Sequence, residues 1–361
     1  MRMHILSPRA HIGNSFLSTN LLHSSPLSKL LFLGVIATLA SLASLLSLVS
    51  PTWAQGKLEP ATLRLDWLAS GYHAPFFLAL ERGYYRDQGI ELVIQDGKGS
   101  TSTIQAVASG SDTFATANLS ATALGITRGI PLVAIAALIQ KSPDSVIALA
   151  NSGIKTPKDI EGKRGAFVTT GAGDRIFPAF AKAAGIETDK VTKIQIASSA
   201  RYSVLLQGNA DFVIGWSFTD AYKINKERPI APPILFADHG INLLSVGVVV
   251  SKDTLANRGS LVRGFLAATV KGIEEAVRAP KAAVDATMKV RPDADRDSLL
   301  AAAEQLGSFL HTKNSETKGA GWMAKEDWEE TKRILVEYLG MSDTVSTESF
   351  YSNDFLPVQR N

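Results

Sequence analysis

Residues 61–95 decide the fold, and they read ATLRLDWLASGYHAPFFLALERGYYRDQGIELVIQ. The run Thr62–Leu65 predicts a strand, and Ile90–Gln95 predicts another. Between them a helix begins at Pro75, whose missing N–H costs nothing at the first helical position, and Gly83 is a natural end for it. A strand, a helix and a second strand in this order are typical of an α/β protein.

The same alternation continues outward from this stretch. Further strands are expected at residues 113–117, 132–138, 146–149, 166–169, 191–196, 211–215 and 246–250, with helices over 101–109, 119–128, 176–184 and 202–207. The pattern restarts near Pro143, which indicates a second lobe, and the strand at 246–250 brings the chain back. Residues 255–339 are almost entirely helical in pattern, with breaks at Pro280 and Pro292. We expect two α/β lobes joined by two crossovers: residues 55–142 with 246–361, including a helical tail on this first lobe, and residues 143–245.

Residues 1–54 have the three parts of a secretory leader. A basic start carries Arg2, Arg9 and Lys29, an apolar run extends from residue 30 to 49, and small residues end the segment at Ala54. Cleavage after Ala54 would release the protein into the periplasm. The apolar run approaches the roughly 20 residues that span a bilayer, so an uncleaved anchor is the alternative.

Charge and cysteine content exclude several classes of function. The leader holds three of the 37 Lys and Arg residues and none of the 34 Asp and Glu, so the remaining chain carries 34 of each sign. This balance gives no electrostatic argument for binding nucleic acid or anionic membranes. The absence of cysteine excludes disulfides, thiolate nucleophiles and cysteine-ligated metal sites. The sequence also holds no Ser-His-Asp arrangement, zinc-binding motif or pair of suitably spaced carboxylates, so we expect neither catalysis nor a metal or other cofactor.

Several short motifs stand out: Leu65-Asp66-Trp67-Leu68, Gly71-Tyr72-His73-Ala74-Pro75-Phe76-Phe77, the segments 81–90, 97–100 and 108–110, and Lys155-Thr156-Pro157 at the entry to the second lobe. These motifs resemble those of the NMT1/THI5-like family. The resemblance implies the bilobed periplasmic-binding-protein fold of type II, closing like a hinged clamp on a small molecule. It further implies a monomer that serves an ABC permease in the membrane.

The resemblance also narrows the ligand. The Asp-Trp and Tyr-His-Ala-Pro motifs are most similar to the branch that binds thiamine pyrimidine precursors, although riboflavin, nitrate, sulfonate and taurine binders share the fold. A sulfonate or nitrate is disfavoured if Asp66 faces the cleft, because a buried carboxylate repels an anion. The resemblance leaves two other classes open: an enzyme like the family's eukaryotic pyrimidine synthases, which are cytosolic and carry a cysteine-rich iron-binding segment, and a ligand sensor for a membrane kinase.

Asp66 and Trp67 come directly after the first strand, and ligands of open α/β sheets sit at the carboxyl ends of strands. An aromatic face beside a carboxylate suits a flat heterocycle with an amino donor. The alternative is a Trp that covers the sheet edge and an Asp that caps a turn. Tyr72 and His73 precede the Pro75 helix and could reach the same place. In the eukaryotic synthases the His of this motif is consumed as substrate, which implies that His73 faces the pocket.

Two glycine-rich loops complete the predicted site. Residues 97–101 in the first lobe and 169–174 in the second could direct N–H groups and hydroxyls at a polar ligand, although most glycine turns are only turns. Asn118, Ser120 and Trp216 follow strands in equivalent positions, and for Trp216 a core role is the alternative. The candidate ligand contacts are therefore Asp66, Trp67, Tyr72, His73, Gly99, Ser100, Asn118, Ser120, Thr170, Gly171, Gly173, Asp174 and Trp216.

Overall fold

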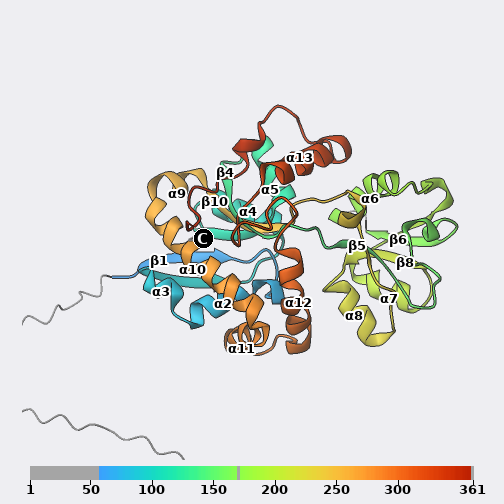
Figure 1. Cartoon of the computed structure of the whole chain (residues 1–361), viewed down its shortest axis with the longest axis horizontal. Helices are drawn as coiled ribbons and strands as arrows, with labels where there is room; N and C mark the ends of the chain where they lie inside the picture. The colour runs from blue at the N-terminus through green and yellow to red at the C-terminus, as the bar shows by residue number, and fades with distance from the viewer. Residues whose placement is uncertain (1–56, 169–170, 359–361) are drawn as a thin grey trace, which may run out of the picture. The chain divides into compact units, whose positions relative to one another are not determined.

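The computed structural model describes residues 57–168 and 171–358, coloured along the chain in Figure 1. The expected leader and the candidate contact Thr170 lie outside these ranges. In the described part of the chain, no helix has both the length and the apolar character that crossing a bilayer requires.

The first lobe is built on a five-stranded mixed sheet with the order β2-β1-β3-β10-β4. Strand β1 pairs in parallel with β2 and β3, whereas β10 pairs antiparallel with β3 and β4. The strands are β1 (Glu59–Arg64), β2 (Ile90–Gln95), β3 (Phe114–Asn118), β4 (Leu132–Ile139) and β10 (Val246–Ser251). The carboxyl ends of β1, β2 and β3 therefore meet at one edge of this sheet.

The second lobe repeats this arrangement in the order β7-β6-β8-β5-β9. Strand β6 is parallel to β7 and β8, and β5 is antiparallel to β8 and β9. The strands are β5 (Asp144–Ala148), β6 (Arg164–Val168), β7 (Thr192–Ile196), β8 (Phe212–Trp216) and β9 (Ile234–Leu235). The chain crosses between the sheets twice, through residues 140–143 and 236–245, which confirms the expected bilobed architecture.

Helices cover both sheets. In the first lobe they are α2 (Ala74–Glu81), α3 (Tyr84–Asp87), α4 (Ser100–Ala108) and α5 (Leu119–Thr127), and in the second α6 (Ala172–Ala183), α7 (Arg201–Leu206) and α8 (Asp220–Glu227). The tail adds α9 (Lys252–Asn257), α10 (Gly259–Arg278), α11 (Pro280–Val290), α12 (Arg296–Phe309) and α13 (Lys325–Leu339).

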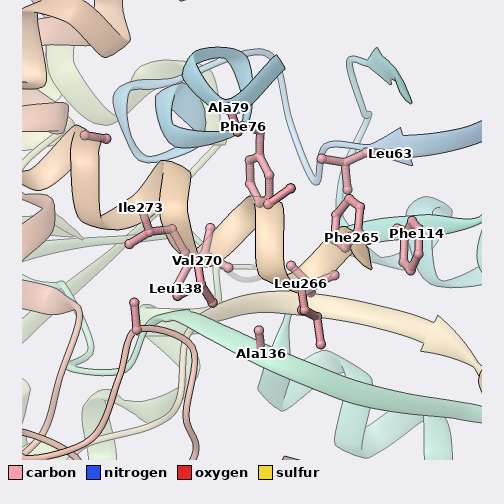
Figure 2. Close-up of a cluster of buried hydrophobic side chains, with 14 of the residues drawn as sticks. Leu63, Phe76, Ala79, Phe114, Ala136, Leu138, Phe265, Leu266, Val270 and Ile273 are labelled. Carbon is pink, nitrogen blue, oxygen red and sulfur yellow. The ribbon is translucent and has the colours of Figure 1, made fainter. Parts of the chain in front are cut away.

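The core of the first lobe lies between the sheet and the pair α2 and α10, as Figure 2 shows. Phe114 of β3 stacks on Phe265 of α10 with ring centroids 3.9 Å apart. Gly272 lets α10 approach α2 closely, because a Cβ there would lie 2.6 Å from the carbonyl oxygen of Pro75. The tail is thus part of the first lobe's core.

Helix α13 lies further along the tail and contacts both lobes. It packs on α5 of the first lobe and α6 of the second, and Lys182 of α6 pairs with Glu337 of α13 at 3.0 Å. The last helix of the tail therefore connects the lobes as well as covering the first.

The clearest differences between the structure and the expected elements are three. Helix α6 begins four residues before the expected start, and the carboxylate of Asp174 in its first turn accepts a hydrogen bond from the N–H of Val168 at 2.8 Å. Helix α8 was not expected, because few of its residues are apolar and the periodic signal is weak. Residues 310–324 interrupt the helical tail, where Thr312 and Asn314 donate to Asp327 of α13. Polar side chains hold this interruption in place.

Candidate ligand-binding cleft

A cleft of about 990 Å³ lies between the two lobes, and residues from both lobes and from the tail line it. We call it the interlobe cleft. Its wall holds five aromatic side chains, two on the first lobe and three on the second: Trp67, Tyr72, Tyr202, Trp216 and Tyr222. Trp67 and its neighbour Leu68 in this wall are exposed apolar side chains, at 57% and 60% exposure. Such a wall offers flat apolar surface to a planar ligand.

Asp66 stands at the end of β1 and is held by three side-chain donors. Its Oδ1 accepts from Nε2 of His73 at 2.8 Å and from the hydroxyl of Thr116 at 2.6 Å, and its Oδ2 accepts from the hydroxyl of Tyr72 at 3.1 Å. The N–H of Ser70 donates to Nδ1 of His73, which places the ring proton on Nε2. All three donors converge on one carboxylate at the cleft wall.

This network sets the protonation of the pair Asp66 and Tyr72. Burial alone would raise the pKa of Asp66, but His73 beside it and the hydrogen bonds from His73, Thr116 and Tyr72 outweigh burial and leave the pKa below the ordinary value. Burial, and then the negative charge of Asp66, raise the pKa of Tyr72 well above its ordinary value. Asp66 is thus an acceptor and Tyr72 a fixed donor.

The lone pairs of Asp66 limit what it can offer a ligand. Each carboxylate oxygen accepts about two hydrogen bonds. Oδ1 already accepts two, whereas Oδ2 accepts one, from Tyr72. One acceptor site on Oδ2 therefore remains for a ligand N–H.

The glycine-rich loop of the first lobe supports this wall instead of contacting a ligand with its N–H groups. The N–H of Gly97 donates to the carbonyl of Trp67 and that of Gly99 to the carbonyl of Asp66. A Cβ at Gly97 would lie 1.7 Å from the carbonyl oxygen of Leu65, and Gly99 has a φ of +112°. Glycine is needed at both positions, at the first for close approach and at the second for the backbone angle.

Trp216 ends β8 and faces Tyr72 across the floor of the cleft. Their ring centroids lie 5.8 Å apart, and Phe218 packs against both, at 6.3 Å from Tyr72 and 5.6 Å from Trp216. Phe218 in turn contacts Phe309 of α12 at 5.0 Å. The two lobes therefore meet in an aromatic cluster directly beneath the cleft.

Asp220 organises the wall of the second lobe much as Asp66 organises the first. Its Oδ1 accepts from the hydroxyl of Tyr202 at 2.6 Å, and its Oδ2 accepts from the N–H of Trp216 at 2.7 Å and from Arg201 at 3.2 Å. A Cβ at Gly215 would lie 2.8 Å from Oδ2, so glycine lets the carboxylate reach the strand end. Each lobe thus holds one cleft tyrosine on a buried carboxylate.

Charges in the cleft wall are predominantly acidic. Arg291 of the tail pairs with Asp96 at 3.0 Å, and Arg201 pairs with Asp220. The lining holds five acidic residues, Asp66, Asp96, Asp220, Asp293 and Asp295, against three basic ones, Arg201, Lys223 and Arg291. An anionic ligand would meet net repulsion here.

The structure brings together six of the expected contacts: Asp66, Trp67, Tyr72, Gly99, Ser100 and Trp216 all line the cleft. The others lie elsewhere. His73 is fully buried behind Asp66, Asn118 caps α5, and the Ser120 hydroxyl donates to the carbonyl of Leu244 at 3.4 Å.

The loop of the second lobe does not form the expected facing clamp. Gly171 and Gly173 make room for carboxylates, since a Cβ on them would lie 2.0 Å from Asp174 and 2.5 Å from Asp144, respectively. Asp174 itself lines a separate cavity of about 250 Å³. The α7 and α8 segments line the cleft in place of this loop.

Sequence reasoning missed Arg201, Tyr202, Asp220 and Tyr222 in the second lobe, and the tail segment 290–295. The sequence did hold a signal for Asp220. Like Asp66, it is an acidic residue close to the carboxyl end of a strand, four residues after Trp216. The tail segment gave no local signal, because only tertiary packing brings it to the cleft. In the two described ranges, no group of histidines and carboxylates could hold a metal ion.

Residues 70–283 match the family model described as NMT1/THI5 like. The chain belongs to this family. It is 23% identical over 315 residues to the riboflavin-binding protein RibY of Chloroflexus aurantiacus, covering 84% of this chain and 88% of that one. It is 24% identical to the formylaminopyrimidine-binding protein of Halalkalibacterium halodurans, covering 82% of this chain and 90% of that protein. It is also 24% identical to the 4-amino-5-hydroxymethyl-2-methylpyrimidine phosphate synthase of Legionella pneumophila, covering 82% of this chain and 92% of that protein.

Among solved structures, the periplasmic aliphatic sulphonate binding protein SsuA of Escherichia coli has a TM-score of 0.64 to this chain. The match covers 84% of this chain and 96% of the SsuA chain, at 14% sequence identity. This likeness confirms the type II periplasmic-binding-protein fold expected for members of the NMT1/THI5-like family.

Proposed function

We propose that this member of the NMT1/THI5-like family is the substrate-binding protein of an ABC importer and captures a flat, uncharged or cationic heterocycle in the interlobe cleft. An amino-pyrimidine of the thiamine-precursor type is the first choice, and riboflavin is the second. The names of the two binding-protein relatives support both choices.

One observation carries the proposal: five aromatic side chains and the Asp66 carboxylate line the same cleft. Stacking on such rings contributes on the order of 0.5–1.5 kcal/mol per pair beyond the buried area. The remaining acceptor site on Oδ2 of Asp66 then orients an exocyclic N–H of the ring. Flat apolar area with a single directional acceptor suits an aminated heterocycle better than an aliphatic compound.

The same cleft disfavours sulfonate and nitrate. The acidic residues of its lining outnumber the basic ones, and two of the three basic side chains are already paired with carboxylates. The likeness to the sulphonate-binding protein is one of fold at 14% identity, so it gives no support for an anionic ligand.

Export and a membrane partner complete the proposal. The leader-like pattern of residues 1–54 supports a periplasmic location, and the crossovers at 140–143 and 236–245 would let the lobes close over the ligand. The closed lobes, which we take as residues 55–142 with 246–361 and residues 143–245, would form the surface that a permease recognises.

A synthase is the candidate from another class, because one relative of similar coverage is named as one. Against it, His73 has no exposed surface and both of its ring nitrogens are hydrogen-bonded, which suits a residue that supports Asp66. An absorbance band of pyridoxal phosphate in the purified protein would favour the synthase.

Calorimetric titration of the chain from residue 55 onward tests the proposal. We expect saturable heat with formylaminopyrimidine or riboflavin and none with an aliphatic sulfonate. Binding of the sulfonate without binding of either heterocycle would contradict the proposed function.

A further inference from the structure

Arg201 is a cleft residue that makes few hydrogen bonds to the described part of the chain. It begins α7, lines the interlobe cleft, and its side chain is 19% exposed. A guanidinium has five N–H donors. Among the described residues Arg201 makes one hydrogen bond, from Nη1 to Oδ2 of Asp220 at 3.2 Å.

Within residues 57–168 and 171–358, one further donor of this mostly buried group is shut off from solvent without an acceptor. This donor is Nε, which is sheltered from solvent and has no partner among the described residues, and Nη2 lies 3.7 Å from Oδ2 of Asp174, beyond hydrogen-bond distance. Leaving a buried donor unpaired costs about 1–3 kcal/mol, and more for a charged group. An acceptor that enters the cleft and pairs with this guanidinium would remove that cost.

The surroundings fix the guanidinium in place. Asp220 and Asp174 hold it from α8 and α6, and neither carboxylate could approach if Gly215 and Gly171 carried side chains. Arg201 is therefore preorganised before any ligand arrives, which lowers the entropy lost on binding.

The charges around Arg201 decide what kind of acceptor it takes. Three carboxylates interact electrostatically with the Arg201 guanidinium: Asp144, Asp174 and Asp220. Together they exceed the single positive charge of Arg201, so the position carries no surplus positive charge for an anion. A neutral oxygen, such as that of a carbonyl or an amide, gains the hydrogen bond without the repulsion.

We propose that Arg201 forms a second recognition site on the second-lobe wall, which binds a neutral carbonyl oxygen of the ligand, while Asp66 on the first lobe binds an N–H group. This inference rests on the proposed function and narrows its ligand to a heterocycle with a donor at one end and an uncharged carbonyl at the other. Because the two residues belong to different lobes, a ligand that satisfies both also links the lobes in the closed state.

Calorimetry with a matched pair of probes tests the site. The pair is formylaminopyrimidine and an analogue in which an alkyl chain of the same length replaces the formamide. Wild type should bind the carbonyl-bearing compound at least about tenfold more tightly, the size of one hydrogen bond to a charged group. Arg201→Met should bind both compounds equally. Arg201→Lys keeps the charge between Asp174 and Asp220 and keeps N–H donors, so it should remain folded and retain part of the preference.

Arg175→Gln is the matched control, because Arg175 is exposed on α6 and does not line the interlobe cleft. This variant should keep the wild-type preference, and thermal unfolding of every variant reports its fold. If Arg201→Met keeps the wild-type preference for the carbonyl-bearing probe, the inference is wrong and the proposed function stands. If wild type binds neither the pyrimidines nor riboflavin, the proposed function fails, and this inference fails with it.

Discussion

The rings of Tyr72 and Trp216 lie 5.8 Å apart between centroids, although Tyr72 belongs to the first lobe and Trp216 ends β8 in the second. Phe218 packs against both rings, so the floor of the interlobe cleft is an aromatic contact between lobes. A ligand that stacks on this floor touches both lobes at once. Changes here should therefore affect ligand affinity more than the stability of either sheet.

Trp216→Leu should weaken binding of the heterocycle by about 10- to 100-fold, because it removes a stacking face worth roughly 1–3 kcal/mol in area and ring contact. Isothermal titration with the ligand that wild type binds measures the loss. Trp322→Leu is the control, since Trp322 is half-buried beside Lys318 and does not line the cleft. Equal losses in the two variants would contradict a role for Trp216 in the site.

Asp66→Asn should destabilise the first lobe by about 1–3 kcal/mol at pH 7, because an amide cannot accept from His73, Thr116 and Tyr72 together. The pKa of Asp66 lies below its ordinary value of 3.8 in the folded chain. The ionised group therefore stabilises the fold above about pH 3.8, and this contribution disappears as the pH falls through the native pKa.

Urea unfolding at pH 7 and at pH 3 measures this difference. The difference in unfolding free energy between wild type and Asp66→Asn should be smaller at pH 3 than at pH 7. Asp87→Asn, an exposed change on α3, should match wild type at both pH values. An equal difference in unfolding free energy at both pH values would show that the ionised carboxylate is not what stabilises this network.

Local patterns in the sequence predict most of the fold and the first-lobe wall of the cleft. Strand β1, Pro75 and the Asp66–Trp67 pair lie within one short stretch, so periodicity and strand-end position suffice to place them. The second-lobe wall could not be predicted in this way. Arg201 and Asp220 come from two segments that only the packing of α7 and α8 on the sheet brings together, and the periodic signal of α8 is weak.

The glycine loops show a second limit of sequence reasoning. Flexible loops at strand ends suggest ligand contact, but Gly97 and Gly99 donate to the backbone of Trp67 and Asp66, and Gly171 and Gly173 make room for carboxylates. A glycine needed for close approach and one needed for ligand contact look the same in a sequence. Only the neighbouring atoms distinguish them.

Gly97→Ala should disrupt the first-lobe wall, because its Cβ would lie 1.7 Å from the backbone oxygen of Leu65, an atom that cannot move without shifting β1. We expect a loss of about 1–3 kcal/mol in unfolding free energy, as for an overpacked core, and loss of ligand binding. Gly307→Ala on α12 is the control, since its nearest neighbour is a side-chain methyl of Val277 at 3.3 Å. Unchanged stability and binding in Gly97→Ala would show that the loop can move away from β1.

Asp144→Asn should stabilise the protein at neutral pH. Burial, and to a smaller extent the charges of Asp174 and Asp220, raise the pKa of Asp144 to about 6, so its ionisation above that pH works against the fold. The hydroxyl of Ser142 donates to Asp144 at 2.9 Å, and the amide oxygen of an asparagine can accept the same hydrogen bond. The variant thus removes the buried charge and keeps the contact.

The expected gain is about 1–2 kcal/mol at pH 8. This is less than the rise of the pKa from 3.8 to about 6 would give for a fully buried group, because the Asp144 side chain is only half-buried. It should shrink as the pH falls from 6 towards 4, where wild type also carries a neutral group in its folded state. Urea unfolding at pH 8 and at pH 4.5 measures both values, with the exposed Asp189→Asn as control. Because Asp144 begins β5 directly after the crossover at 140–143, a destabilised variant at pH 8 would mean that its charge is needed where the chain passes between the lobes.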